Sequence, residues 1–305
     1  MSLNSTIDKI NQIEREKNMN KVAKLSLCIA ALLLLGGCSQ EQKQANQETT
    51  VVSTSQETGQ SVATYTNLDS KSSVEEVKTL LSAHLDKESV ESFFKLVNEY
   101  NEIVNSVGLQ GEFAPFIKTE YDVETISKLW NAKHSDFVGT NCRINSYVLL
   151  KNNIEIPKIT KDDALLFIDN DAIDNGKLFS AEDKEDFNRL FSRVQTEKTT
   201  DVSIHAAKME QFLSQFKFSD NARMLSVVLH DNLDGESLFI GHVGVLVPMN
   251  DGFLFVEKLS FEEPYQAIKF KTKEDCYQYL LTKYADYTGE GLAKPFIMDN
   301  NKWVH

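Results

Sequence analysis

The sequence predicts an α+β domain in which a helical N-terminal part packs on an antiparallel β-meander. Three observations support this. Apolar residues recur at helical spacing between residues 73 and 216. Alternating β-branched and aromatic runs follow between residues 222 and 270, bounded by Asp-Gly turns at 234–235 and 251–252. No β/α unit repeats, and helices followed by strands in separate blocks favour antiparallel pairing.

The apolar spacing places six helices before the sheet, over residues 73–85, 88–108, 123–134, 141–151, 181–194 and 203–216. Gly108 supplies the stop signal of the second helix, and Ser180 is the expected N-cap of the fifth. In the third helix, Ile126, Leu129 and Trp130 share one side. These helices make up most of the first two-thirds of the domain.

The β-rich region is expected to contain four successive antiparallel strands, over residues 222–233, 237–248, 252–261 and 265–270. A last helix over 273–286 and a short strand over 295–298 complete the order. With 305 residues and 41% hydrophobic content, the chain is long enough to bury one sizeable core. The net charge of −13 leaves no basic stripe, which excludes nucleic acid as an expected partner.

The N-terminus reads as an export signal. Met19 is the expected true start, and two lysines then precede an apolar run from Leu25 to Leu35. This run of about 11 residues is shorter than the roughly 20 that span a bilayer as a helix. We therefore assign residues 1–37 to a signal peptide, with a retained transmembrane helix as the alternative.

The signal ends in LGGC at residues 35–38, which resembles the lipobox of bacterial lipoproteins. The resemblance implies that Cys38 is lipid-modified and anchors an exported protein to the outer face of a bacterial membrane. An ordinary signal peptide with a chance cysteine is the alternative. Residues 38–66 are rich in Gln, Thr, Ser and Glu, so we expect a flexible tether there and a single globular domain over residues 67–305.

The stretch GTNCRINSYVLL, at residues 139–150, places Cys142 at the start of a predicted helix. A helix N-terminus and a neighbouring imidazolium lower a thiol pKa from about 8.5 toward about 3.5–7.5. His242, in the middle of a predicted strand, is the candidate base. Glu257 interrupts an apolar row on the next strand and is placed to accept from the second imidazole nitrogen. Taken singly, a buried cysteine or histidine is more often a packing residue.

These three residues make Cys142 a candidate nucleophile. A cysteine that attacks a carbonyl group also needs hydrogen-bond donors for the oxyanion of the tetrahedral intermediate. The backbone N–H of Cys142 is the natural first donor, because it lies at the expected helix start. Asn141, Asn145 and Gln266 are candidate second donors. All three amides are also common as capping or surface groups.

The order of a helix-borne cysteine, a strand with His-Val-Gly-Val and a following strand with a polar residue resembles the papain-like cysteine hydrolases. The most similar are the NlpC-type enzymes, which cut peptide bonds in bacterial cell walls. The resemblance covers residues 140–151 and 238–261. It implies a peptidase or amidase reaction, with peptidoglycan peptide as the substrate class. The alternative is a catalytically inactive lipoprotein binding module of the cell envelope.

A second resemblance extends over residues 66–303, to the bacterial lipoprotein family called domain of unknown function 4300. The segments that carry it are NLDSKSSVEEVK, FVGTNCRIN, LHDNLDG, LFIGHVGVLVP, LSFEEPYQAIKF and AKPFIMDN. It implies lipidation and the extent of the domain, and it leaves the reaction open.

No cofactor or metal is expected. The chain has no Walker-type loop, no dinucleotide-binding fingerprint and no HExxH motif. DAIDNGKLFSAE, at residues 171–182, partly fits the calcium-loop template, but Ile173 occupies a ligand position. His230, Asp231 and His242 could together form a metal site, but only if three or four ligands converge, and we do not expect zinc here.

Overall fold

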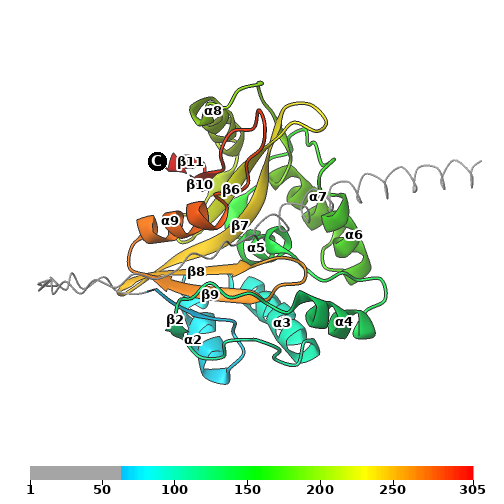
Figure 1. Ribbon diagram of the computed structural model, residues 1–305, viewed down its shortest axis with the longest axis vertical. Coiled ribbons are helices and arrows are strands. Elements are labelled where there is room, and N and C mark those ends of the chain that lie inside the picture. The colour runs from blue at the N-terminus through cyan, green and yellow to red at the C-terminus, as the bar shows by residue number, and fades with distance from the viewer. Residues whose placement is uncertain (1–62, 305) are drawn as a thin grey trace, which may run out of the picture. The chain divides into compact units, whose positions relative to one another are not determined.

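An antiparallel sheet lies at the centre of the computed structural model, which describes residues 63–304 (Figure 1). The strands run in the order β11-β10-β6-β7-β8-β9-β1-β2, and β4 pairs with β7 beside this path. All their pairings are antiparallel, which confirms the predicted β-meander. The strands are β1 (Thr64–Thr66), β2 (Ala114–Pro115), β4 (Val194–Gln195), β6 (Arg223–Asp231), β7 (Ser237–Met249), β8 (Gly252–Lys258), β9 (Tyr265–Phe270), β10 (Phe296–Asp299) and β11 (Lys302–Val304). A separate pair joins β3 (Ile154–Glu155) to β5 (Lys217–Phe218).

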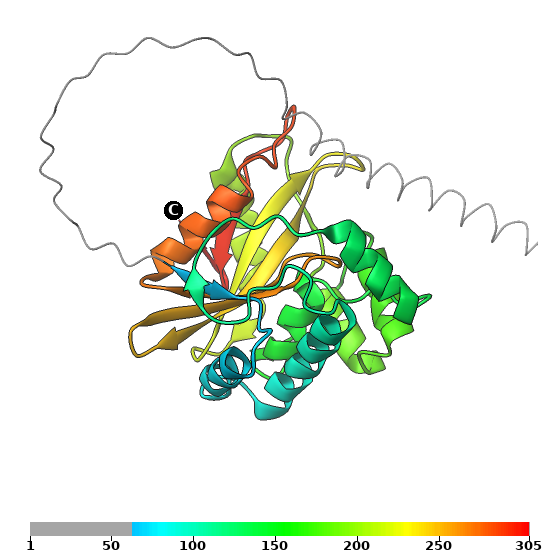
Figure 2. The same ribbon diagram turned by 60° about the horizontal axis from the view of Figure 1, so that its bottom comes forward.

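Helices cover both faces of the sheet. Residues 63–304 contain α2 (Lys71–Ser82), α3 (Lys87–Ile103), α4 (Val123–Lys133), α5 (Cys142–Leu150), α6 (Phe167–Gly176), α7 (Ala181–Leu190), α8 (Val202–Leu213) and α9 (Lys273–Lys283). Buried residues of α2 to α8 share one core with one face of the sheet, whereas α9 packs on the other face (Figure 2). The mixed helix and strand content confirms the predicted α+β class.

The pleat of β7 decides which side chains meet which helices. Val243, Val245 and Val247 point into the core shared with α2 to α8. Leu246 points to the opposite face, where it packs with Phe255 and residues of α9. This is the period of two that the sequence predicts, and both sets are fully buried because both faces of the sheet are covered.

The structure contains elements that the sequence did not predict, namely α6, β1 and the short strands β2, β3, β4, β5 and β11. α6 was not expected, because its sequence FIDNDAIDNG has few apolar residues and resembles a loop. β1 lies inside the segment 38–66 that was expected to be a tether, and it pairs with both β9 and β2. The folded part therefore begins before the predicted boundary at residue 67, since three residues suffice to extend a sheet whose neighbouring strand is already formed.

The predicted signal peptide at residues 1–37, the lipidation site at Cys38 and the tether up to residue 62 lie outside the described residues. Within residues 63–304, no helix has the length and apolar character needed to cross a bilayer.

β7 and β8 separate partway along their length. They pair over five residue positions, from Met249 opposite Gly252 to Val245 opposite Val256. Beyond this point, β8 pairs only with β9 and β7 runs along β6. α5 packs against both strands. The strands thus part where the N-terminal half of β7 and the C-terminal end of β8 meet α5 (Figure 1).

Candidate active site

α5 begins at Cys142 because Asn141 caps it. The Asn141 backbone is extended, and its Oδ1 accepts the N–H of Ile144 at 3.0 Å, as a helix N-cap does. Among residues 63–304, the backbone N–H groups of Cys142 and Arg143 have no hydrogen-bond partner. The thiol therefore lies beside two unused donors at the positive end of a helix dipole.

His242 follows a β-bulge. In the pairing of β6 with β7, Val227 lies opposite His242 and Val228 opposite Ile240, so Gly241 is the extra residue. A Cβ on Gly241 would lie 2.3 Å from Leu229 Cδ1, which explains the glycine. A bulge changes the direction of neighbouring side chains, and here it immediately precedes the histidine.

A short hydrogen bond joins His242 to Glu257. His242 Nε2 lies 2.5 Å from Glu257 Oε2, and the two residues are only 1% and 2% exposed. A carboxylate can only accept, so Nε2 carries the proton and donates it. Nδ1 of His242 is then the nitrogen available to the thiol.

Glu257 has three further partners. Gln266 Nε2 and the Tyr279 hydroxyl donate to Oε1, the first at 3.0 Å, and Lys283 Nζ lies 3.4 Å from Oε2. Burial by itself raises the pKa of Glu257, but the charge of Lys283 and the bond to His242 lower it to about 2. Glu257 therefore stays a carboxylate at any pH near neutrality.

Cys142 and His242 interact directly. Burial raises the pKa of Cys142, but the charge of His242, a side-chain hydrogen bond to it and the charge of Arg143 outweigh burial, and the net pKa is lowered. Burial also lowers the pKa of His242, but the charge of Cys142 and hydrogen bonds to Cys142 and Glu257 raise it overall. Both shifts favour a thiolate–imidazolium pair.

Tyr284 packs on the imidazole of this pair. Its ring stacks on the His242 ring, with centroids 5.0 Å apart and planes 28° apart. Burial and the charges of Glu257 and Cys142 raise the pKa of Tyr284 well above its usual value. Cys142 itself is 6% exposed. Residues 285–291, which follow Tyr284, are exposed.

The side-chain amides expected to hold an oxyanion are engaged elsewhere. Asn141 Nδ2 donates to Asp169 Oδ1 at 2.7 Å, and Asn145 Nδ2 donates to Thr140 Oγ1 at 2.9 Å. Gln266 Nε2 donates to Glu257. In this structure Asn141 therefore caps the helix and Gln266 orients the carboxylate. None of the three side-chain amides is free to bind an oxyanion, which leaves the backbone N–H groups of Cys142 and Arg143 as the available donors.

Several residues of the site were not identified from the sequence, namely Tyr279, Lys283 and Tyr284 of the α9 region. Tyr279 and Lys283 are four residues apart and therefore lie on one side of the helix, where Lys283 Nζ contacts the Tyr279 hydroxyl at 3.1 Å. The sequence feature that could have identified Tyr279 and Lys283 is the presence of these two polar residues on the side of the predicted helix that faces the sheet.

A buried lysine holds the loop that follows β8. Lys258 Nζ donates to the carbonyl oxygens of Ser260, Phe261 and Glu263, the first at 2.8 Å, and lies 4.2 Å from the centre of the Tyr100 ring. Burial lowers the pKa of Lys258 to about 7, against the opposing charges of Glu262, Glu263 and Cys142. Three carbonyl acceptors and an aromatic face favour the protonated form at neutral pH.

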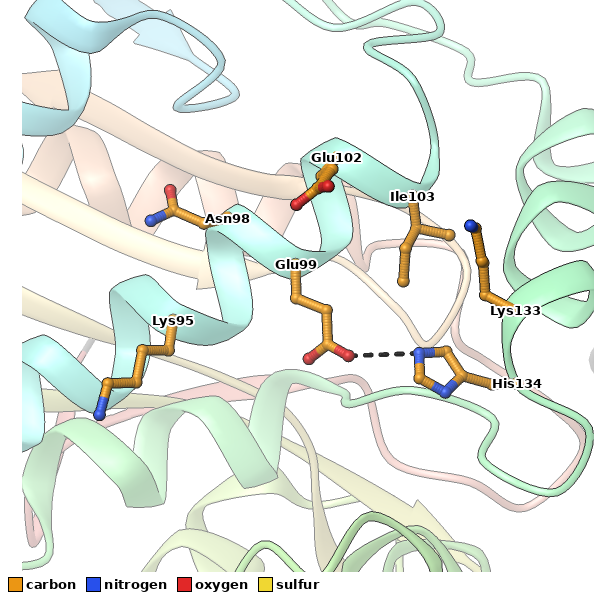
Figure 3. Close-up of a pocket in the computed structure, with 7 residues that line it drawn as sticks. All are labelled: Lys95, Asn98, Glu99, Glu102, Ile103, Lys133 and His134. Atoms are coloured by element: carbon orange, nitrogen blue, oxygen red, sulfur yellow. Dashed lines mark ion pairs between the residues drawn. The ribbon is translucent and has the colours of Figure 1, made fainter.

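Two surface pockets lie away from Cys142. The first, of about 550 Å³, is bounded by α3 and the end of α4, and contains the ion pair between Glu99 Oε1 and His134 Nε2 at 3.2 Å (Figure 3). The second, of about 440 Å³, follows α2 over residues 75–83. Cys142, His242 and Glu257 line neither pocket, in keeping with the covered state of the thiol.

The segment that partly fits the calcium-loop template is helical in its first half. Residues 171–176, which hold the first half of the template, belong to α6, so they cannot wrap around an ion. Within residues 63–304, no group of three or more His, Cys, Asp or Glu side chains is placed to hold a metal. His230 Nε2 instead contacts Glu236 at 2.8 Å, away from His242.

Replacement of His242 should raise the pKa of Cys142. In H242A, burial remains and the interactions that lower the pKa are lost, so less thiolate is present at pH 6. We expect iodoacetamide to alkylate Cys142 at least about tenfold more slowly at pH 6, since one pKa unit changes the thiolate fraction tenfold. Peptide mapping by mass spectrometry measures the rate at Cys142.

The matched control is H205A, since His205 is also fully buried but contacts Thr196 and Thr199. Cys276 is an internal control in each sample, because burial raises its pKa well above the usual value. Equal rates for wild type and H242A at pH 6 would contradict the thiolate–imidazolium pair.

Removal of the Tyr284 ring should expose the thiol. Because Tyr284 stacks on the imidazole next to Cys142, we expect Y284A to open access to the thiol and alkylation at about pH 9 to become several-fold faster. At this pH a thiol of lowered pKa is fully ionised, so the rate reports access rather than ionisation. Y284F keeps the ring and should react like the wild type. The same rate for Y284A and Y284F would show that Tyr284 is not the cover.

One comparison with known proteins identifies a family. A family model described as Domain of unknown function (DUF4300) matches residues 64–304. No curated protein and no solved structure shows significant similarity to the chain. The match covers the whole described fold, from β1 to β11 and including the site between α5, β7 and β8. The chain therefore belongs to the family described as domain of unknown function DUF4300.

Proposed function

We propose that this protein is a cysteine hydrolase that cleaves an amide bond. Cys142 is the nucleophile, His242 transfers the proton, and Glu257 orients the imidazole. One observation carries the proposal: a single buried imidazole bonds Glu257 at 2.5 Å from its Nε2 and lies close enough to Cys142, at the start of α5, for each to shift the pKa of the other. The order of these residues along the chain also supports it, because papain-like hydrolases use the same order.

The reaction follows from the protonation states. The Cys142 thiolate attacks the amide carbon, and the electron pair of the C=O bond moves to the oxygen. The imidazolium of His242 then gives its Nδ1 proton to the leaving amine as the C–N bond breaks, which leaves a thioester on Cys142. His242, now neutral, takes a proton from water, whose oxygen attacks the thioester and restores the thiolate as the acid leaves.

The start of α5 can stabilise the oxyanion of both steps. The backbone N–H groups of Cys142 and Arg143 are unpaired among residues 63–304 and belong to the first turn of the helix. Donors fixed before the reaction stabilise a developing charge at little cost in reorganisation. In this proposal, backbone groups fill the role that the sequence suggested for Asn141 and Gln266.

The substrate class follows from the proposed location. If Cys38 carries a lipid, the domain lies on the outer face of a bacterial membrane, where cell-wall peptides are the abundant amide substrates. We therefore propose peptidoglycan peptide as the substrate, consistent with the resemblance to NlpC-type enzymes. Cys142 is 6% exposed, so in this proposal the substrate reaches it after a local movement of the residues around it, among which we assign Tyr284, stacked on His242, as the part that moves.

The burial of Cys142 favours a second candidate function. A thiol that is only 6% exposed is also what an inactive relative of a hydrolase would keep as packing. Such a protein would act as an envelope binding module. The two functions differ in whether Cys142 forms a covalent intermediate.

Turnover of cell-wall peptide tests the proposal. We expect the full-length protein to release new amino groups from purified peptidoglycan fragments, detected by mass spectrometry. C142A should lower the rate at least about a thousandfold, as loss of a nucleophile does in other hydrolases. C276A is the matched control and should keep activity, since Cys276 is buried within α9, away from the start of α5. Binding of fragments without cleavage, in wild type and C142A alike, would favour the binding module.

A further inference from the structure

A buried ion pair lies next to the candidate nucleophile. Arg143 Nε and Nη2 contact both oxygens of Asp169, at 2.9 and 2.7 Å. Asp169 belongs to α6 and is fully buried, and the side chain of Arg143 is 15% exposed. A bidentate guanidinium–carboxylate pair fixes the relative orientation of its two side chains through two parallel hydrogen bonds.

Asp169 holds both neighbours of Cys142. Its Oδ1 accepts from Asn141 Nδ2 at 2.7 Å as well as from Arg143 Nε. Asn141 in turn caps α5 through its Oδ1. One carboxylate from α6 therefore fixes the residue before and the residue after the thiol, and with them the direction in which the first turn of α5 begins.

Arg143 also reaches the strand of His242. Its third donor, Nη1, bonds the carbonyl oxygen of Ile240 at 3.0 Å, and Ile240 lies in the bulge two residues before the histidine. This edge of β7 has no β8 partner, because β8 pairs with β7 only from Val245 onward. Ser146 Oγ bonds the Val243 carbonyl oxygen at 3.2 Å on the same edge. Side chains of α5 thus replace the missing strand on both sides of His242.

We propose that Arg143 and Asp169 are positioning residues that hold the thiol of Cys142 against the imidazole of His242. The inference rests on the proposed function, because it assigns this pair a role at the same thiol. The pair acts by fixing the position of the Cys142 thiol rather than by supplying charge, because the charges of the guanidinium and the carboxylate neutralise each other. Asp169 connects the start of α5 to α6, and Arg143 connects it to the bulge of β7.

The conservative variant R143K separates position from charge. Lysine keeps the positive charge, but it cannot form a bidentate pair with Asp169 and donate to the carbonyl oxygen of Ile240 at the same time. We expect the alkylation rate of Cys142 at pH 6 to fall about tenfold and the midpoint of its pH profile to rise by about one unit. The rate at high pH should stay close to that of the wild type, because only the ionisation of the thiol changes.

The matched control is R193K. Arg193 is 13% exposed and its Nε pairs with Asp162 at 2.7 Å, but it lies on the link between α7 and β4 rather than beside the thiol. Both variants remove the bond from the Nε of a mostly buried guanidinium to a carboxylate, so the melting temperature of each should fall. A merely structural role for Arg143 predicts that the pH profile of Cys142 is the same in R143K and R193K, and this result would overturn the inference.

D169E provides a second test if R143K does not fold. It keeps the carboxylate but moves it by one methylene, which shifts Arg143 and Asn141 together, and we expect the same rise in the midpoint. An unchanged midpoint would overturn the inference. Failure of the proposed function looks different, because wild type and C142A would then bind peptidoglycan fragments alike without cleaving them, whatever the pH profile of Cys142 in R143K.

Discussion

The approach of Cys142 to the His242–Glu257 pair depends on the separation of β7 from β8. If the two strands paired along their full length, the histidine and the glutamate would lie in a closed sheet with no room for α5. Because pairing stops at Val245, α5 reaches the free edge of β7. The imidazole then has the carboxylate on one nitrogen and the thiol as its other partner. Nε2 of His242 therefore keeps its proton in the bond to Glu257, and Nδ1 is the nitrogen that exchanges a proton with the thiol.

Much of this arrangement can be predicted from the sequence. The strands of the meander follow from alternating apolar residues and Asp-Gly turns, and their alternation places His242 and Glu257 on the faces found in the structure. The helix start at Cys142 follows from Asn141, whose side chain is a favoured cap. These features depend on local chemistry, which a single sequence contains.

The remaining features depend on contacts distant in sequence. α6 has the composition of a loop, and Asp169 acquires its role only because Arg143 and Asn141 approach it from α5. The bulge at Gly241 adds one residue to β7, and no local signal distinguishes that glycine from others in the strand. Gln266 was assigned to the oxyanion because its chemistry allows it. In the structure, the register of β9 with β8 places it opposite Glu257 instead.

The central claim is that Cys142 and His242 share charge as a thiolate–imidazolium pair. The most direct measurement is the titration of the His242 ring by nuclear magnetic resonance in the wild type and in C142S. Cys142 is the main group that raises the pKa of His242, whereas Glu257 is present in both proteins. The account predicts that the ring is an imidazolium at neutral pH in the wild type and titrates at a lower pH in C142S. The same titration in both proteins would contradict it.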